Sequence, residues 1–177
     1  MRRIILFLLA VCVLLLSGCS SGTKPVAAKD IDFVFSCKAD VTASAGNYLC
    51  AVSRAGRSDA SVEILTGAGS GMKWCWNGSS FCQTYRSLTA ESGACTLPKS
   101  SFASILVRVL DCAETPGALQ DLGEGSFSGR LEDCTFTLAA DGRNDKIQSI
   151  SVPDWGLKFQ FHDYSEPVLK TEIPFNH

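Results

Sequence analysis

Cysteine is the residue type with the greatest chemical range in this sequence, which contains nine cysteines. Exported cysteines form disulfides, whereas closely spaced cysteines and histidines bind zinc. After residue 19 the two closest cysteines are Cys75 and Cys82, with six residues between them. Zinc-binding cysteines are usually separated by about two to four residues, and the only histidines here are His162 and His177. The spacing therefore predicts no metal site, and no other motif calls for a cofactor.

The segment around Cys75 and Cys82 has the pattern of a β-hairpin. Asn and Gly at residues 77–78 form a strong turn signal between two β-prone runs. A turn in this segment would place Cys75 opposite Cys82 and Trp76 opposite Phe81. Opposite Cβ atoms lie about 4.5–5.5 Å apart, a distance that a disulfide can close. A structural disulfide or two thiols is favoured over a redox-active pair, because no Cys-x-x-Cys motif at a helix start is present.

Cys37 and Cys50 form a second candidate pair, because both fall on the apolar face of another predicted hairpin. Seven cysteines follow Cys19, so at least one thiol stays unpaired or pairs outside the chain. Buried cysteine also behaves as an ordinary small hydrophobic side chain. We therefore predict candidate disulfides at Cys75 with Cys82 and at Cys37 with Cys50, and we assign no complete connectivity.

The sequence shows no arrangement typical of catalysis. Nucleophilic catalysis usually needs a base beside a Ser, Cys or Thr side chain. His162 falls on the same strand face as Lys158, which predicts a solvated imidazole, and His177 is the last residue. A Gly-x-Ser-x-Gly elbow and a phosphate-binding loop are both missing from the sequence. We predict that the protein is not an enzyme.

Residues 1–18 have the features of an export signal. Two arginines precede an apolar stretch at residues 4–16, which is shorter than the roughly 20 residues of a transmembrane helix. The segment LSGC at residues 16–19 resembles the lipobox of bacterial lipoproteins. This resemblance implies that Cys19 carries acyl chains such as palmitate and becomes the mature N-terminus. We expect the membrane as a partner and a lipid-anchored position on its extracytoplasmic face.

Composition and charge exclude one further class of partner. The chain has 16 basic and 18 acidic side chains, and no basic stripe is present. Nucleic acid is therefore not an expected partner. We predict a signal peptide at residues 1–18, a lipidated cysteine and flexible tether at 19–30, one domain at 31–164 and a C-terminal extension at 165–177.

The periodicity of hydrophobic residues predicts the elements that would position these side chains. Residues 30–42 alternate between apolar and polar side chains, as a strand with one buried face does, and several later segments do the same. Residues 81–88 are predicted as one strand, and residues 115–125 as a loop or short helical turn. Helical spacing over residues 98–114, with Ser100 or Ser101 as the cap, predicts a helix. We predict an α+β fold: a curved antiparallel sheet, an open half-barrel of about eight strands, with the helix on its concave face.

Four short pieces of the sequence resemble a group of lipoproteins common in Firmicutes. They are FSCKADVT at residues 35–42, GMKWCWNG at 71–78, LPKSSFASIL at 97–106 and ISVPDWGL at 150–157. Those lipoproteins share a lipoprotein-carrier (LolA-like) fold, a curved sheet with a helix in its cavity. The resemblance implies the fold, and relatives of that fold carry or sense acyl chains in an apolar cavity.

If such a cavity exists, inward-facing aromatic side chains would line it or fill it. Filling is the favoured interpretation, because inward aromatics dominate ordinary cores as well. The candidate residues are Phe33, Phe35, Tyr48, Trp74, Trp76, Phe81, Phe102, Phe136, Phe159 and Phe161.

Two hypotheses for function follow from these observations. The first is a non-catalytic, membrane-anchored envelope protein that binds a lipid or another apolar ligand. The alternative is a structural or protein-interaction lipoprotein with a filled core and no small-molecule ligand. A concave apolar surface would favour the first hypothesis, and exposed hydrophobic patches would favour the second.

Overall fold

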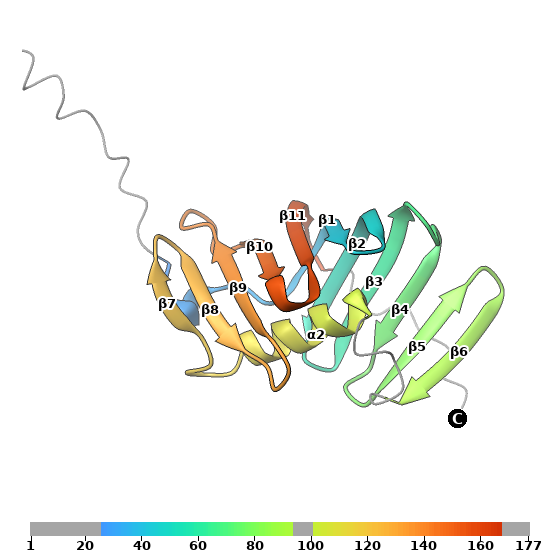
Figure 1. Ribbon diagram of the computed structural model, residues 1–177, viewed down its shortest axis with the longest axis horizontal. Coiled ribbons are helices and arrows are strands. Elements are labelled where there is room, and N and C mark those ends of the chain that lie inside the picture. Colours follow the sequence, from blue (N-terminus) through green and yellow to red (C-terminus); the bar gives the residue numbers. More distant parts are fainter. Residues whose placement is uncertain (1–25, 94–100, 168–177) are drawn as a thin grey trace, which may run out of the picture.

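The computed structural model describes residues 26–93 and 101–167, and Figure 1 labels its elements. The predicted leader, the anchor cysteine Cys19 and most of the predicted C-terminal extension lie outside these residues. Within the described ranges, no helix is both long enough and apolar enough to cross a membrane.

Six strands run from the centre of the sheet to one edge, and each pairs antiparallel with the next. They follow one another through short turns, so each hairpin adds its second strand beside its first. A short 3-10 helix, η1 (Ala28–Asp30), precedes them. The strands are β1 (Phe35–Ala43), β2 (Gly46–Gly56), β3 (Asp59–Thr66), β4 (Met72–Trp76), β5 (Ser80–Tyr85) and β6 (Leu88–Gly93).

The chain then passes to the opposite edge through α2 (Phe102–Ala113) and returns to the centre. The returning strands are β7 (Gln120–Gly123), β8 (Ser126–Arg130), β9 (Thr135–Ala140), β10 (Ile147–Val152) and β11 (Leu157–Ser165), with the 3-10 helix η2 (Pro153–Trp155) before β11. Because β11 pairs with β1, the strand order is β6-β5-β4-β3-β2-β1-β11-β10-β9-β8-β7.

Among the described residues the sheet has eleven strands, so the expectation of about eight is wrong. The segment predicted as one strand at residues 81–88 is interrupted at Arg86, whose φ of 56° turns the chain and separates β5 from β6. The segment predicted as a loop at residues 115–125 contains β7. The α+β class, the antiparallel sheet and its open form are confirmed, because β6 and β7 form two separate edges.

Helix α2 lies across one face of the sheet because it connects the two edges (Figure 1). We call this the inner face and the opposite one the outer face. The helix begins after Ser101, whose side chain makes no capping hydrogen bond. Ile105, Leu106, Val109 and Leu110 are buried, as their helical spacing predicts.

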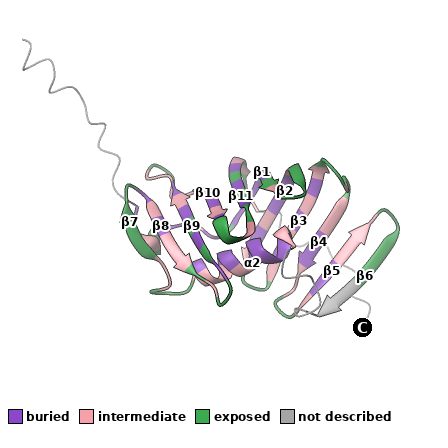
Figure 2. Ribbon diagram, viewed as in Figure 1, coloured by how far each residue is buried: buried purple, intermediate pink, exposed green. Residues whose placement is uncertain are grey.

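The hydrophobic core fills the space between α2 and the middle of the sheet. Buried residues concentrate on α2 and on the central strands, whereas β7 and the first half of β6, Leu88 to Ala90, are exposed (Figure 2). Four phenylalanines, Phe35, Phe127, Phe136 and Phe159, are at most 1% exposed. The core therefore depends on inner-face side chains that are far apart in the sequence.

Candidate functional site

Residues 26–34, which we call the N-terminal strap, pack against the core before β1 begins. Val26, Ile31 and Phe33 are its buried apolar side chains. The backbone N–H of Asp32 donates a hydrogen bond of 2.9 Å to the carbonyl oxygen of Asp145, between β9 and β10. Val26 is thus buried against the core although it falls in the segment predicted as a tether.

A cavity of about 590 Å³ lies between the N-terminal strap, the end of α2 and the turn after it. Small-molecule pockets typically have volumes of about 300–1,000 Å³, so a small ligand would fit. The charged residues at this cavity are Lys29, Asp32 and Glu114, and most of its lining is apolar. The larger apolar contributors are Ile31, Phe33, Val34 and Leu119. We call this space the strap cavity.

Arg54 joins the walls of the strap cavity to the sheet. Its side chain comes from β2 and is 0% exposed. One guanidinium nitrogen, Nη1, donates a hydrogen bond of 2.9 Å to the carbonyl oxygen of Phe33 in the strap. The other, Nη2, donates to Asp111 Oδ1 at 2.8 Å and to Glu114 Oε2 at 2.7 Å. A single buried side chain therefore connects β2, the strap and the end of α2.

Arg57 adds a second, more exposed link to the same end of the helix. Its Nε donates to Glu114 Oε2 at 3.2 Å, and its Nη2 donates to Thr115 Oγ1 at 2.8 Å. Glu114 consequently accepts hydrogen bonds from both arginines. The two cations also face the C-terminal end of α2, where positive charge is favourable.

The two carboxylates beside Arg54 respond differently to their surroundings. Burial raises the pKa of Asp111, and this effect exceeds the opposing hydrogen bond and charge of Arg54. Desolvation also acts to raise the pKa of Glu114, but the hydrogen bonds and charges of Arg54 and Arg57 outweigh it, so this pKa is lowered. Glu114 is thus the carboxylate whose negative charge the two arginines stabilise most.

Sequence analysis did not identify Arg54 as a site residue, although a signal was present. Cys50 was predicted to lie on the apolar face of its hairpin, and Arg54, four residues later on the same strand, falls on that face. A charged side chain at an inward position is rare and requires partners. The partners come from the strap and from α2, which are distant in the sequence.

Comparison with known proteins gives structural likenesses of low sequence identity. No protein-family model matches the chain, and no curated protein matches it either. Among solved structures, the LolA superfamily protein NE2245 from Nitrosomonas europaea is similar, with 10% sequence identity and a TM-score of 0.44. The match covers 81% of this chain and 92% of that one.

The aromatic residues predicted to line or fill a cavity lie in the core or against it. Of the ten, Phe33 lines the strap cavity. Phe102 on α2 contacts Tyr48 and Trp74, with ring centroids 5.3 and 5.4 Å apart, respectively. The other members of the core cluster and its packed neighbours are Phe35, Trp76, Phe81, Phe136, Phe159 and Phe161.

The predicted cysteine pairs differ in their register. Cys75 lies directly opposite Cys82, as the hairpin signal predicted. Cys37 lies opposite Val52, and Cys50 opposite Ala39, so these two thiols are diagonal neighbours on the inner face. Burial raises the pKa of Cys37 and of Cys50 to about 12, which keeps both thiols protonated. No disulfide is present in the described ranges, where all six of the cysteines are thiols.

A second, more polar hollow of about 370 Å³ lies on the outer face over β1 to β4 and β11. Small side chains such as Ser53 and Ser61 line this hollow. The charged side chains of Lys38, Lys73 and Asp163 also line it. Lys38 forms an exposed ion pair of 3.1 Å with Asp163. Polar side chains make up a larger share of the lining of this outer hollow than of the strap cavity.

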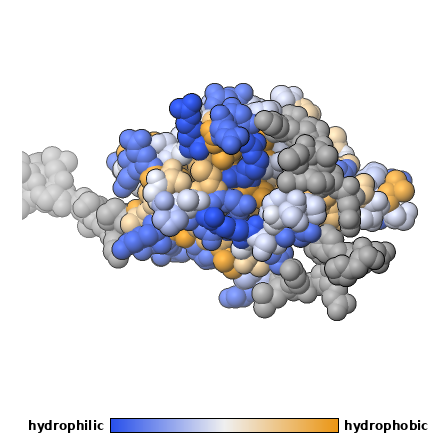
Figure 3. Space-filling view, turned by 90° about the horizontal axis from the view of Figure 1, so that it is seen from below, coloured by the Kyte–Doolittle hydropathy of each residue, from blue (hydrophilic) through white to orange (hydrophobic). Residues whose placement is uncertain are grey.

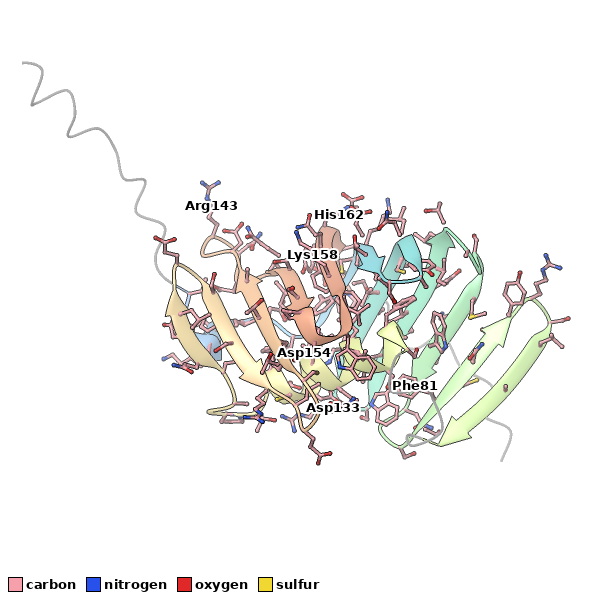
Figure 4. All side chains as sticks on the ribbon, in the orientation of Figure 1. Phe81, Asp133, Arg143, Asp154, Lys158 and His162 are labelled. Carbon is pink, nitrogen blue, oxygen red and sulfur yellow. The ribbon has the colours of Figure 1, made fainter. Side chains whose placement is uncertain are left out.

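His162 lies on the outer side of β11 with 40% of its side-chain surface exposed, although its Nε2 atom is buried. It projects from β11 on the side away from α2, as Lys158 does (Figure 4). Its ring nitrogens lie 3.4 Å from carboxylate oxygens of Asp40 and Asp163. In the described part of the chain, no group of three or more His, Cys, Asp or Glu side chains is placed to hold a metal ion.

Exposed hydrophobic side chains do not gather at one place. Seen from below, hydrophobic residues form scattered groups among hydrophilic ones (Figure 3). The large exposed hydrophobic residues found in the described ranges are Val34, Leu88 and Leu122, which belong to the strap, β6 and β7. Of the two hollows described above, the strap cavity has the larger share of apolar lining, which suits a small apolar ligand.

Proposed function

We propose that the protein is a lipid-anchored envelope protein that binds an apolar ligand, such as an acyl chain, in the strap cavity. The observation that carries this proposal is the combination of volume and lining: a recess of about 590 Å³ lined mainly by apolar side chains. Few of the residues that line the cavity are charged, as in binding sites where a few polar groups orient a mostly apolar ligand.

The position of the cavity in the chain supports an acyl chain as the ligand. The strap that forms one wall begins at Val26, seven residues after the proposed anchor Cys19. Seven residues span at most about 25 Å when fully extended. An anchor at Cys19 would therefore hold the strap cavity close to the membrane surface, where acyl chains are abundant.

The anchor is tested by replacing Cys19. The Cys19→Ala chain should move from the membrane fraction to the soluble fraction after its leader is removed. Cys12→Ala is the matched control, because Cys12 lies within the apolar leader and should leave the anchoring unchanged. A Cys19→Ala chain that loses its leader and still sediments with membranes would contradict the anchor.

The ligand is tested by photochemical labelling of membranes that carry the full chain. A palmitic acid with a diazirine group should crosslink to peptides from residues 28–34 and 113–119. Leu119→Trp should reduce this labelling several-fold, because the indole occupies the cavity that Leu119 lines. Leu122→Trp is the control, since Leu122 is exposed on neighbouring β7. Labelling elsewhere, or labelling unchanged by Leu119→Trp, would refute the ligand proposal.

The alternative is a structural or protein-interaction lipoprotein without a small ligand. The tightly filled space under α2 favours it, because Ile105, Leu106 and Leu110 are at most 1% exposed. This alternative predicts no crosslinking at the strap cavity, while it predicts the same loss of anchoring for Cys19→Ala. The two experiments therefore separate the ligand from the anchor.

A further inference from the structure

Cys75 and Cys82 lie opposite each other on the outer face of the sheet. Trp74 lies on the inner face, because its ring contacts Phe102 of α2 with centroids 5.4 Å apart. The next residue, Cys75, therefore points to the outer face, since successive side chains alternate along a strand. Cys82 is its direct partner in the β4–β5 register and shares that face.

From this register we propose that Cys75 and Cys82 form a cross-strand disulfide that joins β4 to β5. Residues directly opposite each other in an antiparallel pair have Cα atoms about 4.5–5.5 Å apart, inside the disulfide range of about 4.4–6.8 Å. The exposed fractions of the two residues, 5% and 3%, show that the pair is shielded from water. This proposal does not depend on a ligand in the strap cavity.

The other candidate pair lacks this geometry. Cys37 and Cys50 are displaced by two residues in the β1–β2 register. Diagonal neighbours lie about 7–8 Å apart, beyond the reach of a disulfide without movement of the backbone. The register thus selects one of the two pairs that the sequence left open.

The reaction is a thiol–disulfide exchange with a small-molecule or protein disulfide as the oxidant. One thiol of the pair loses its proton and attacks the oxidant, which releases one thiol and leaves a mixed disulfide. The second thiol then attacks this mixed disulfide and expels the other thiol of the oxidant. The pair loses two protons and two electrons in total, and the oxidant takes them up. Burial raises the pKa of Cys75 in the folded chain, so the exchange should occur as the hairpin assembles.

The consequence is a fixed register at the edge of the sheet. In the strand order, the β5–β6 hairpin pairs with the rest of the sheet through β4. A bond between Cys75 and Cys82 prevents β5 from separating from β4 or slipping in register. Such a movement would expose Phe81 and Trp76, whose ring centroids lie 4.6 Å apart. Hydrogen exchange of the amides in β5 should therefore be at least several-fold slower in the oxidised chain.

One tryptic peptide gives a direct test. Trypsin cleaves after Lys73 and Arg86, so both cysteines fall in residues 74–86. The full chain is refolded with reduced and oxidised glutathione, and remaining thiols are alkylated before digestion. We expect this peptide to carry no alkyl group and to be lighter by two hydrogens than the dithiol. After reduction it should gain two alkyl groups.

Two variants control for misfolding and for other pairings. Cys134→Ser removes a cysteine outside the hairpin and should leave the loop in peptide 74–86 intact. Cys75→Ser should make Cys82 accessible to alkylation after unfolding. Two alkyl groups on the peptide without prior reduction, or a link from either cysteine to another peptide, would overturn the proposal.

Discussion

The middle of the sheet and the β5–β6 hairpin share the same antiparallel pairing, yet their side chains are protected in different ways. In the middle, α2 covers the inner face, and side chains such as Phe136 are buried almost completely. In the hairpin, Leu88 is 71% exposed, and β6 is an edge strand. The difference indicates that packing under α2 stabilises the middle, whereas the outer strand of the hairpin depends mainly on strand pairing, with Phe81 of β5 as the hairpin's link to the core.

The largest contrast is expected from removing one large apolar side chain in each region. Phe136→Ala should lower the free energy of unfolding by about 3–5 kcal/mol, because it leaves a cavity in the core. The Phe136 ring also packs on Gly129, where an added Cβ would lie 2.2 Å from the ring. Leu88→Ala should change the free energy by about 0.5 kcal/mol or less. Urea denaturation of the full chain gives both values.

Equal losses of unfolding free energy for Phe136→Ala and Leu88→Ala would contradict the contrast between the middle of the sheet and the hairpin. Such a result would mean that the hairpin contributes to the core as much as the residues under α2 do. A loss of the predicted size only for Phe136→Ala would place the stabilising contacts under the helix.

The next contrast concerns charge, with Arg54 in the middle and Lys38 on the outer face. Arg54→Met should lower the free energy of unfolding by about 2–3 kcal/mol, because Asp111 and the carbonyl of Phe33 lose the Arg54 donor and Glu114 keeps the hydrogen bond from Arg57. This is below the usual cost of breaking a fully buried pair, since Asp111 and Glu114 are partly exposed. Lys38→Met should leave the denaturation midpoint almost unchanged, because its pair with Asp163 is exposed to water.

A variant that also lacks the partner charges tells whether the stability loss in Arg54→Met comes from charge or from packing. Adding Asp111→Asn and Glu114→Gln to Arg54→Met should recover part of the lost stability, because no buried charge would then remain unpaired. If the triple variant is less stable than Arg54→Met alone, the loss comes from side-chain packing and not from charge.

The sequence predicted the parts of this fold that depend on neighbouring residues. The β4–β5 hairpin and the pairing of Cys75 with Cys82 follow from a local turn signal, and α2 follows from helical spacing. The strands β6 and β7 were missed, because neither has an apolar alternation; their pairing partners make them strands. The strap cavity and the partners of Arg54 could not be predicted, since they join residues from three distant segments.

The smallest expected effect separates the two carboxylates that hold Arg54. The pKa of Glu114 is lowered in the folded chain, so its charge stabilises the fold above its ordinary value of 4.5 and loses this contribution as the pH falls below it. Glu114→Gln should cost about 0.5–1 kcal/mol at pH 7. It should also flatten the decline in stability below pH 4.5, as measured by urea denaturation across a pH series.

Asp111 should show the opposite sign, because burial raises its pKa in the folded chain. Its contribution is largest when it is protonated and falls as the pH rises through the folded pKa, so it partly offsets the acid loss from Glu114. Asp111→Asn should therefore steepen the decline in acid, whereas the exposed Glu132→Gln should follow the wild-type curve. If both Asp111→Asn and Glu114→Gln flatten the curve, Arg54 stabilises the two carboxylates alike, and the end of α2 is held by an evenly shared ion pair.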